Sequence, residues 1–179
     1  MNKKNILERN INYSNAYGRN LLQEAIVSCE NTIAVDLVNK GIDINHQDKK
    51  EMTPLHFCAQ YNNITIAELL LQNGAKVNVT DCYGNHPLWY AVFNANNDYR
   101  LVKLLVRYGA DALSKNNAIR SPLDFAKQIK DMEMINILTI KNAIIRHLLH
   151  RKFIKKQEQN RQEKFCRFCL VSRGCPIRR

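Results

Sequence analysis

Apolar residues in this chain fall into short helical stripes that recur at a nearly constant interval. In one segment Ile66, Leu69 and Leu70 lie at i, i+3 and i+4, which places them on one side of an α-helix. Four segments share an aligned leucine, and three of these leucines follow a proline; the four are Leu22, Leu55, Leu88 and Leu123. The steps between them are 33, 33 and 35 residues. This pattern predicts a stack of similar helical units.

Proline and glycine mark where the helices of each unit begin and end. Proline suits the first turn of a helix because an N–H there needs no partner, and Thr53 precedes Pro54 as a candidate N-cap. Three units close on a glycine, which accepts a left-handed backbone at low cost; these are Gly41, Gly74 and Gly109. The glycines step by 33 and 35 residues. We therefore expect two inserted residues between the helices of the third unit, around residues 94–97.

The second unit carries the most complete motif. It reads TPLHFCA from Thr53, IAELLL from Ile66 and GAKVN from Gly74, and in this it resembles an ankyrin repeat. The third unit adds DCYG from Asp81 and a proline-leucine pair in the same register. The resemblance covers roughly residues 12–143.

This resemblance implies an all-α fold, a solenoid of about four helix-turn-helix repeats joined by β-hairpin-like loops. It also implies that His56 is a structural residue, with a hydrogen bond between adjacent loops, and has no catalytic role. We assign residues 1–143 to the repeat domain, with its first and last repeats degenerate, and residues 144–179 to a basic C-terminal extension. Terminal repeats are expected to depart from the motif because one face of each meets solvent.

The third repeat departs from the motif at two positions. His86 stands where threonine is usual and Trp89 where histidine is usual, which leaves the inter-loop hydrogen bond open there. Residues 87–95 and 121–127 also resemble a group of compact bacterial ankyrin proteins. Those proteins often lie beside genes for secreted antibacterial toxins, so the resemblance implies an immunity or adaptor protein.

Charge is divided unevenly between the two parts of the chain. The net charge is +2 over residues 1–143 and +9 over residues 144–179, which accounts for the +11 of the whole chain. Apolar residues keep helical spacing from Ile135 to Phe153, so we expect helix up to about residue 155. The basic extension could bind an acidic protein, nucleic acid or an anionic membrane surface, or could be a solvated terminus.

The cysteines fall into two groups. Those within the repeats are interpreted as reduced structural thiols; they are Cys29, Cys58 and Cys82. A second group follows two histidines with spacing that could in principle supply a tetrahedral zinc site; its members are His147, His150, Cys166, Cys169 and Cys175. We favour a flexible tail with free thiols, and we predict no metal and no cofactor.

Enzymatic function has no support in the motifs of the chain. There is no glycine-rich phosphate loop and no Gly-x-Ser-x-Gly elbow in the sequence. A chain of 179 residues with 45% hydrophobic residues suits one elongated core. No segment resembles a signal peptide, and no run approaches the ~18 apolar residues of a membrane span. We expect a soluble, cytoplasmic, monomeric protein.

The resemblance places partner binding on the concave side of the stack, formed by the hairpin tips and the exposed face of each first helix. Carried over by position, the candidates at the tips are Tyr17, Arg19, Lys49, Lys50, Met52, Cys82, Tyr83, Asn85, Asn117 and Arg120. The candidates on the helices are Gln60, Tyr61, Phe93 and Asn94. Aromatic residues and arginine carry most of the energy at interface centres, so we expect the anchors to be Tyr17, Arg19, Tyr61, Tyr83 and Phe93. Nucleic-acid or anionic-surface binding through the extension is the alternative function.

Overall fold

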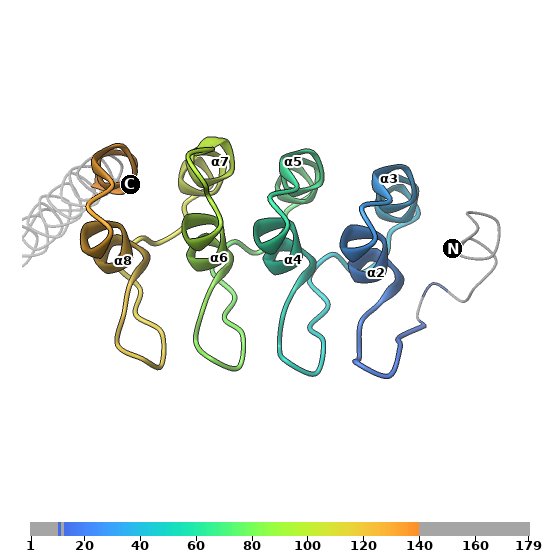
Figure 1. The fold of residues 1–179 in the computed structure, drawn as a ribbon. Helices are drawn as coiled ribbons and strands as arrows, with labels where there is room; N and C mark the ends of the chain where they lie inside the picture. Colours follow the sequence, from blue (N-terminus) through green and yellow to red (C-terminus); the bar gives the residue numbers. More distant parts are fainter. Residues whose placement is uncertain (1–10, 12, 140–179) are drawn as a thin grey trace, which may run out of the picture. The chain divides into compact units, whose positions relative to one another are not determined.

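The computed structural model describes residues 11 and 13–139, which fold into four helix pairs (Figure 1). In chain order the pairs are α2 (Leu21–Val27) with α3 (Asn31–Asn39), α4 (Pro54–Gln60) with α5 (Ile64–Gln72), α6 (Pro87–Phe93) with α7 (Arg100–Arg107), and α8 (Pro122–Gln128) with the helical residues 132–139. We number these pairs as repeats 1 to 4. The predicted all-α fold of about four helix-turn-helix repeats is confirmed. The boundary predicted at residue 143 and the helix predicted up to residue 155 lie outside the described residues.

The repeats stack so that their helices form two rows. Figure 1 shows α2, α4, α6 and α8 in one row, which we call the inner helices, and α3, α5 and α7 in a second row, the outer helices. Neighbouring helices within each row pack on one another. A hairpin loop extends from each inner helix on the side away from the outer row (Figure 1). None of the described helices is long and apolar enough to cross a membrane.

The aligned apolar residues form the core between the repeats. Leu55 and Ala59 of α4 are each 1% exposed, and Leu70 of α5 is completely buried, as the helical stripe predicts. Cys58 is also completely buried, and this burial raises the pKa of its thiol. Short helices of this kind are marginal alone, so the shared core between neighbouring repeats stabilises each pair.

The inner helices begin where the sequence signals indicate. Proline occupies the first turn of α4, α6 and α8. In α2, which lacks that proline, the Asn20 side chain accepts a hydrogen bond from the N–H of Gln23 at 3.0 Å. In α8 the Ser121 hydroxyl accepts from the N–H of Asp124 at 3.1 Å. These caps satisfy N–H groups that have no partner inside the helix.

The insertion in repeat 3 lies where its spacing predicts. Residues 94–99 separate α6 from α7, whereas residues 61–63 separate α4 from α5. Asn96 and Asn97 take left-handed backbone angles there, with φ of 43° and 66°. Asparagine tolerates that conformation better than most residues, so the longer turn leaves the helices on either side in register.

The last inner helix differs from the others at one repeat position. Ile26, Ala59 and Val92 take this position on α2, α4 and α6, and all three are buried. The matching residue of α8 is Lys127, which is exposed. A charged, exposed residue therefore stands on α8 where the first three inner helices have a core residue.

Each hairpin is closed by the same two backbone hydrogen bonds. In repeat 3 the N–H of Asp81 donates to the carbonyl of Asn85 at 2.9 Å, and the N–H of Gly84 donates back to the carbonyl of Asp81 at 2.9 Å. The same pair of bonds closes the other three loops, which span residues 15–19, 48–52 and 116–120. The predicted hairpin-like loops are thus present without β-strands in the described residues, which hold one isolated bridge between Ser14 and Asn20.

An Asn or Asp side chain braces every one of these hairpins. The Oδ1 of Asp81 accepts from the N–H groups of Tyr83 at 2.9 Å and Asn85 at 2.8 Å. The first residue of each other hairpin accepts from the same two positions at 2.8 to 3.1 Å; these residues are Asn15, Asp48 and Asn116. Such side-chain turns fix a loop without any partner strand.

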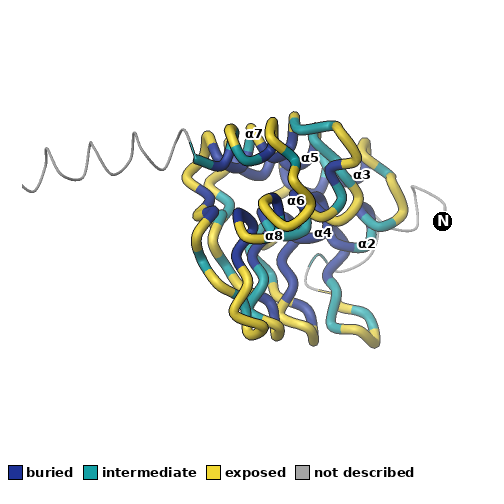
Figure 2. Tube along the Cα trace, turned by 60° about the vertical axis from the view of Figure 1, so that its left-hand side comes forward, coloured by how far each residue is buried: buried dark blue, intermediate teal, exposed yellow. Residues whose placement is uncertain are grey.

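Neighbouring hairpins are joined by one backbone hydrogen bond at each step of the stack. The bonds run from Lys49 N–H to the Tyr17 carbonyl at 3.1 Å, from Cys82 to Lys50 at 3.1 Å, and from Asn117 to Tyr83 at 3.0 Å. The four hairpins therefore form one continuous row. Most residues at the tips of the hairpins are exposed, as Figure 2 shows.

This row brings Gly84 close to the next hairpin. Its φ is +75°, and a Cβ built on it would lie 2.6 Å from Oδ1 and 3.0 Å from the backbone nitrogen of Asn117. Gly74, which ends α5, also has a positive φ of +87°, but it has no atom within 4 Å of such a Cβ. The two glycines share the same backbone requirement and differ in the space around them.

We expect Gly84→Ala to destabilise the protein more than Gly74→Ala. Both changes place a side chain at positive φ, which costs about 1–2 kcal/mol, and only Gly84→Ala also pushes the hairpins of repeats 3 and 4 apart. Urea unfolding followed by circular dichroism measures both free energies of unfolding. Equal losses in the two variants would show that close contact between these hairpins adds nothing to stability.

Candidate functional site

Side chains at one position of the inner helices bridge each hairpin to the next. In repeat 1 the Oε1 of Gln23 accepts from the N–H of Asn20 at 2.9 Å, and its Nε2 donates to the carbonyl of Met52 at 2.7 Å. In repeat 2 the Nδ1 of His56 accepts from the N–H of Thr53 at 3.0 Å, and its Nε2 lies 3.1 Å from the carbonyl of Asn85. The structural role predicted for His56 between adjacent loops is confirmed.

The contacts of His56 fix both its tautomer and its charge. Nδ1 faces a backbone donor and Nε2 faces a carbonyl, so the proton of the neutral ring lies on Nε2. His56 is completely buried. This burial lowers the pKa of His56 to about 4, although the carbonyl of Asn85 and the charge of Asp81 act in the opposite direction.

Repeat 3 lacks this bridge. Trp89 stands at the position of His56 and packs its ring 5.9 Å from that of Phe125. His86, at the start of α6, is 2% exposed, and neither ring nitrogen has a hydrogen-bond partner among the described residues. Burial lowers the pKa of His86, against the opposing charge of Asp111. The hairpins of repeats 3 and 4 are joined instead by Asn116, whose Nδ2 donates to Oδ1 of Asn85 at 2.8 Å.

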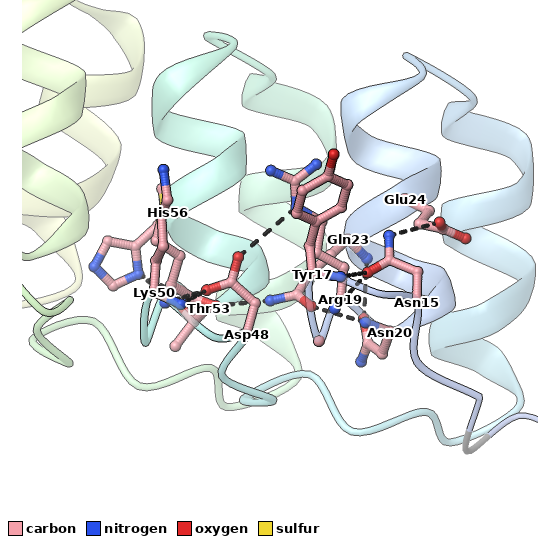
Figure 3. Close-up of polar contacts among 12 residues, drawn as sticks. Asn15, Tyr17, Arg19, Asn20, Gln23, Glu24, Asp48, Lys50, Thr53 and His56 are labelled. Carbon is pink, nitrogen blue, oxygen red and sulfur yellow. Dashed lines mark hydrogen bonds and ion pairs between the residues drawn. The ribbon is translucent and has the colours of Figure 1, made fainter.

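Arg19 lies within the polar contacts of the first two hairpins (Figure 3). Its Nε lies 3.7 Å from the buried carboxylate of Asp48, which makes an ion pair and not a hydrogen bond. Its guanidinium lies over the ring of Phe57 at 4.8 Å and over that of Tyr17 at 5.4 Å. Arg19 therefore balances a buried charge and covers an aromatic ring of α4, so the stack itself already uses its guanidinium.

The predicted surface residues divide by exposure. Four aromatic anchors are exposed, at 68% for Tyr17, 45% for Tyr61, 58% for Tyr83 and 61% for Phe93. The polar candidates that are also exposed are Lys49, Lys50, Gln60, Cys82, Asn117 and Arg120. The half-buried candidates are Arg19, Asn85 and Asn94. We call the surface formed by all of these residues the hairpin face.

Met52 was assigned to this surface incorrectly. Met52 is only 7% exposed and belongs to the hydrophobic core, although its carbonyl closes the hairpin by accepting a backbone bond from Asp48. Repeat position placed it beside Asn85 and Arg120, the last residues of the next two hairpins. The position of Met52 along its hairpin therefore did not predict whether its side chain points outward or into the core.

Two neighbours of Phe93 were not predicted as surface residues. Phe125 of α8 lies 5.4 Å from Phe93 between ring centroids, and Trp89 completes the group. Both Phe125 and Trp89 are half-buried. Phe125 occupies the repeat position of Phe57 and Tyr90, so an aromatic residue recurring on three inner helices was the signal available in the sequence.

No group of three or more metal-ligand side chains occurs within the described residues. The five residues of the candidate zinc site, between positions 147 and 175, lie outside them, as does the basic extension. Cys29 and Cys82 are exposed free thiols, and Cys58 is a buried one. The hairpin face therefore offers aromatic rings, cationic groups and amides to a partner.

Comparison with known proteins agrees with the repeat geometry. A family profile of ankyrin repeats in three copies matches residues 27–116. The chain is 30% identical over 141 residues to an ankyrin repeat protein of Acanthamoeba polyphaga mimivirus, which covers 78% of this chain and 18% of that protein. It is 35% identical over 108 residues to the nuclear factor NF-kappa-B p105 subunit of Mus musculus, with 59% and 11% covered.

A further relative is the alpha-latrotoxin-Lg1a of Latrodectus geometricus. It is 27% identical over 139 residues, which covers 76% of this chain and 10% of the toxin. The chain spans less than a fifth of the length of each of these three relatives. The similarity therefore concerns the repeats and not the whole of the larger proteins.

We expect the stability of the protein to fall as the pH decreases from about 6.5 to about 4. The unfolded chain takes up a proton on His56 near pH 6.5, whereas the folded protein keeps this residue neutral down to about 4, so acid favours unfolding. Protonation of this one residue should cost about 3 kcal/mol across that window. His56→Gln, which copies the contacts of Gln23, should retain most of the stability at about pH 7 and lose much less on acidification.

Urea unfolding of the wild-type protein and of His56→Gln, at about pH 7 and about pH 4.5, measures how much stability each loses on acidification. His86 contributes in the same direction and is present in both proteins, so it cancels in the comparison. The same loss of stability on acidification in both proteins would contradict the assignment of His56 as a neutral bridge.

Proposed function

Because the chain belongs to the ankyrin repeat family, we propose that it is a non-enzymatic binding module that holds a cognate protein on its hairpin face. Ankyrin repeats are an interaction module, and solenoids of this kind present extended binding surfaces. The observation that carries the proposal is the exposure, between 45% and 68%, of the four large aromatic side chains that repeat position assigns to this face. Exposed aromatic residues are enriched at interaction sites.

The scaffold beneath these residues supports the proposal. Tyr17 and Tyr83 each lie in a hairpin braced by an Asx side chain, and each offers its carbonyl to the following hairpin. Their backbones are therefore fixed before any partner arrives. A surface that needs little ordering on binding retains more of its contact energy as affinity.

The resemblance of residues 87–95 and 121–127 to compact bacterial ankyrin proteins gives a narrower form of this proposal. In that form the cognate protein is a toxin, and this chain either occludes the toxin's site as an immunity protein or carries the toxin as an adaptor. An immunity protein would abolish the activity of its toxin in a stoichiometric complex, whereas an adaptor would leave that activity intact. Assay of a toxin with and without this chain separates the two roles.

Binding of nucleic acid or an anionic surface through the extension is the second candidate. The net charge of +9 over residues 144–179 favours it, because the repeats hold little of the basic excess. Phosphate binding loses affinity steeply as salt rises, since counterions are released. An interface centred on exposed aromatics depends on salt much less, so a salt titration of the recovered complex distinguishes the two.

We expect a photo-crosslinker placed at Tyr83 to capture the cognate protein in the native cell. Tyr83 is replaced by p-benzoylphenylalanine, which keeps a large aromatic group at the exposed hairpin tip. The matched control carries the same group at Glu68, an exposed residue of the outer helix α5. A crosslinked protein found at Tyr83 and not at Glu68, identified by mass spectrometry, agrees with the proposal. Equal capture at both positions would contradict it.

We also expect Tyr83→Ala to weaken binding of that protein by about 2 kcal/mol or more, with little change in stability. The side chain of Tyr83 is 58% exposed, and its structural hydrogen bonds come from its backbone. A variant lacking residues 157–179 should keep most of its affinity and lose mainly association rate. Titration of the purified partner measures both. Loss of binding only in the truncated variant would favour the extension as the binding element.

A further inference from the structure

Three aromatic rings lie together at the junction of repeats 3 and 4. Phe93, on the last turn of α6, lies 5.4 Å from Phe125 of α8, and Trp89 lies 5.9 Å from the same ring. We call these three residues the aromatic cluster. Phe93 is 61% exposed, and the other two are half-buried. A partner's apolar side chain can therefore reach all three.

The same positions in the first two repeats offer no such surface. Phe57 corresponds to Phe125, but it is 1% exposed and lies beneath the guanidinium of Arg19. Gln60 corresponds to Phe93 and is polar. The repeats are thus alike in backbone and unlike in surface, and at these positions an exposed aromatic ring stands at the junction of repeats 3 and 4 and not in repeat 2.

Unpaired positive charge accompanies the aromatic cluster. Repeat 4 carries four exposed cations that form no ion pair with any described residue; they are Lys115, Arg120, Lys127 and Lys130. The single carboxylate between residues 112 and 130 belongs to Asp124, which precedes Phe125 and accepts from the N–H of Ser121 at 3.1 Å. Hydrogen bonds from Ser121 lower the pKa of Asp124, and the nearby charges of two lysines in this set lower it further.

The fourth hairpin holds a strained and exposed apolar residue. Ile119 has a φ of 61°, whereas glycine fills its position in the first and third hairpins as Gly18 and Gly84. A β-branched residue is disfavoured at positive φ, and such strain persists chiefly where function requires the side chain. Ile119 is 72% exposed, and its hairpin is bonded to that of Tyr83 through the N–H of Asn117.

We propose that repeats 3 and 4 bind an acidic protein segment that bears a large apolar side chain. The aromatic cluster receives the apolar side chain, Ile119 adds apolar surface on the hairpin of repeat 4, and Lys115 and Arg120 of that hairpin face the segment's carboxylates. This inference rests on the proposed function and specifies where on the hairpin face the partner binds and what its chemistry is. Charge complementarity selects an acidic segment, since the only carboxylate between residues 112 and 130 already accepts a hydrogen bond at the start of its own helix.

Single-stranded nucleic acid fits the same surface less well. Bases stack on accessible, flat ring faces, whereas the rings of the aromatic cluster tilt against each other by 41° and 55°. This tilt favours an anchor side chain inserted among the rings over a stacked strand.

The test begins with a random-peptide phage library selected on the full-length protein. We expect enriched peptides to share an aromatic or large aliphatic residue within a few positions of two or more acidic residues. A synthetic peptide of that consensus, labelled with fluorescein, then gives dissociation constants by fluorescence anisotropy. Enrichment of peptides without acidic residues, or no enrichment at all, would overturn the proposal.

Substitutions then locate the bound peptide. Phe93→Ala should weaken binding at least about tenfold, and Tyr108→Ala, an exposed aromatic at the end of the outer helix α7 and outside the hairpin face, less than about threefold. The double substitution of Lys115 and Arg120 by glutamate should weaken binding more than Lys76→Glu, a charge reversal at an exposed site of repeat 2. Circular dichroism melting confirms that each variant is folded. Equal effects of Phe93→Ala and Tyr108→Ala would overturn the assignment to the aromatic cluster.

Ile119→Gly adds a readout that a purely structural role would not give. Removal of the strained side chain should raise the melting temperature, because glycine adopts this φ freely, while it weakens binding of the peptide. Unchanged affinity in this variant would remove Ile119 from the binding surface and overturn that part of the proposal.

Two further arms separate this inference from the proposed function. If the protein crosslinked at Tyr83 binds Phe93→Ala at full affinity, the hairpin face still binds protein, and the inference about repeats 3 and 4 fails alone. A labelled dT oligonucleotide of about 20 nucleotides provides the second arm. If it binds the full-length protein and Phe93→Ala abolishes that binding, the aromatic cluster serves nucleic acid and the proposal is overturned.

Discussion

The Asx side chain at the start of each hairpin is the contact on which the rest of this structure depends. Asn15, Asp48, Asp81 and Asn116 each accept two backbone N–H groups of their own loop. A loop of five residues has too few backbone partners to hold itself closed. Once it is braced, it can offer one carbonyl to the following hairpin, and the side chains on its tip take fixed positions along the hairpin face.

The remaining polar atom of each brace connects the hairpin to its surroundings, and here the repeats differ. Asp48 pairs with Arg19 of the preceding hairpin, whereas Asp81 accepts the hydroxyl of Tyr90 from its own inner helix at 2.6 Å. Burial raises the pKa of Tyr90, and this hydrogen bond to Asp81 raises it further. In the first half of the stack the Arg19 cation thus covers the ring of Phe57, whereas the corresponding ring of Phe125 in the second half is half-buried.

The sequence predicted the fold well because its period comes from packing. Leucines at steps of 33 and 35 residues fill the same site between successive helix pairs. The pattern therefore predicts how many repeats there are, that they are helical, and in which order their helices follow. It also located the insertion in repeat 3, since proline and glycine mark the helix ends on either side. Surface residues follow no such rule. Their repeat position says which loop they occupy, but not whether the side chain turns outward.

Three residues show where sequence reasoning about the surface stopped. Met52 has the position of an exposed tip residue, and its burial depends on how its hairpin packs on the core. Phe125 was overlooked because its exposure depends on α6, a helix 35 residues earlier in the repeat register. Ile119 looks ordinary in sequence, and only its positive φ reveals the strain.

Lys127 limits what can pack on α8. A helix that packed against this position would have to strip water from an ammonium group, whereas the apolar residues at the same position of α2, α4 and α6 are buried without that cost.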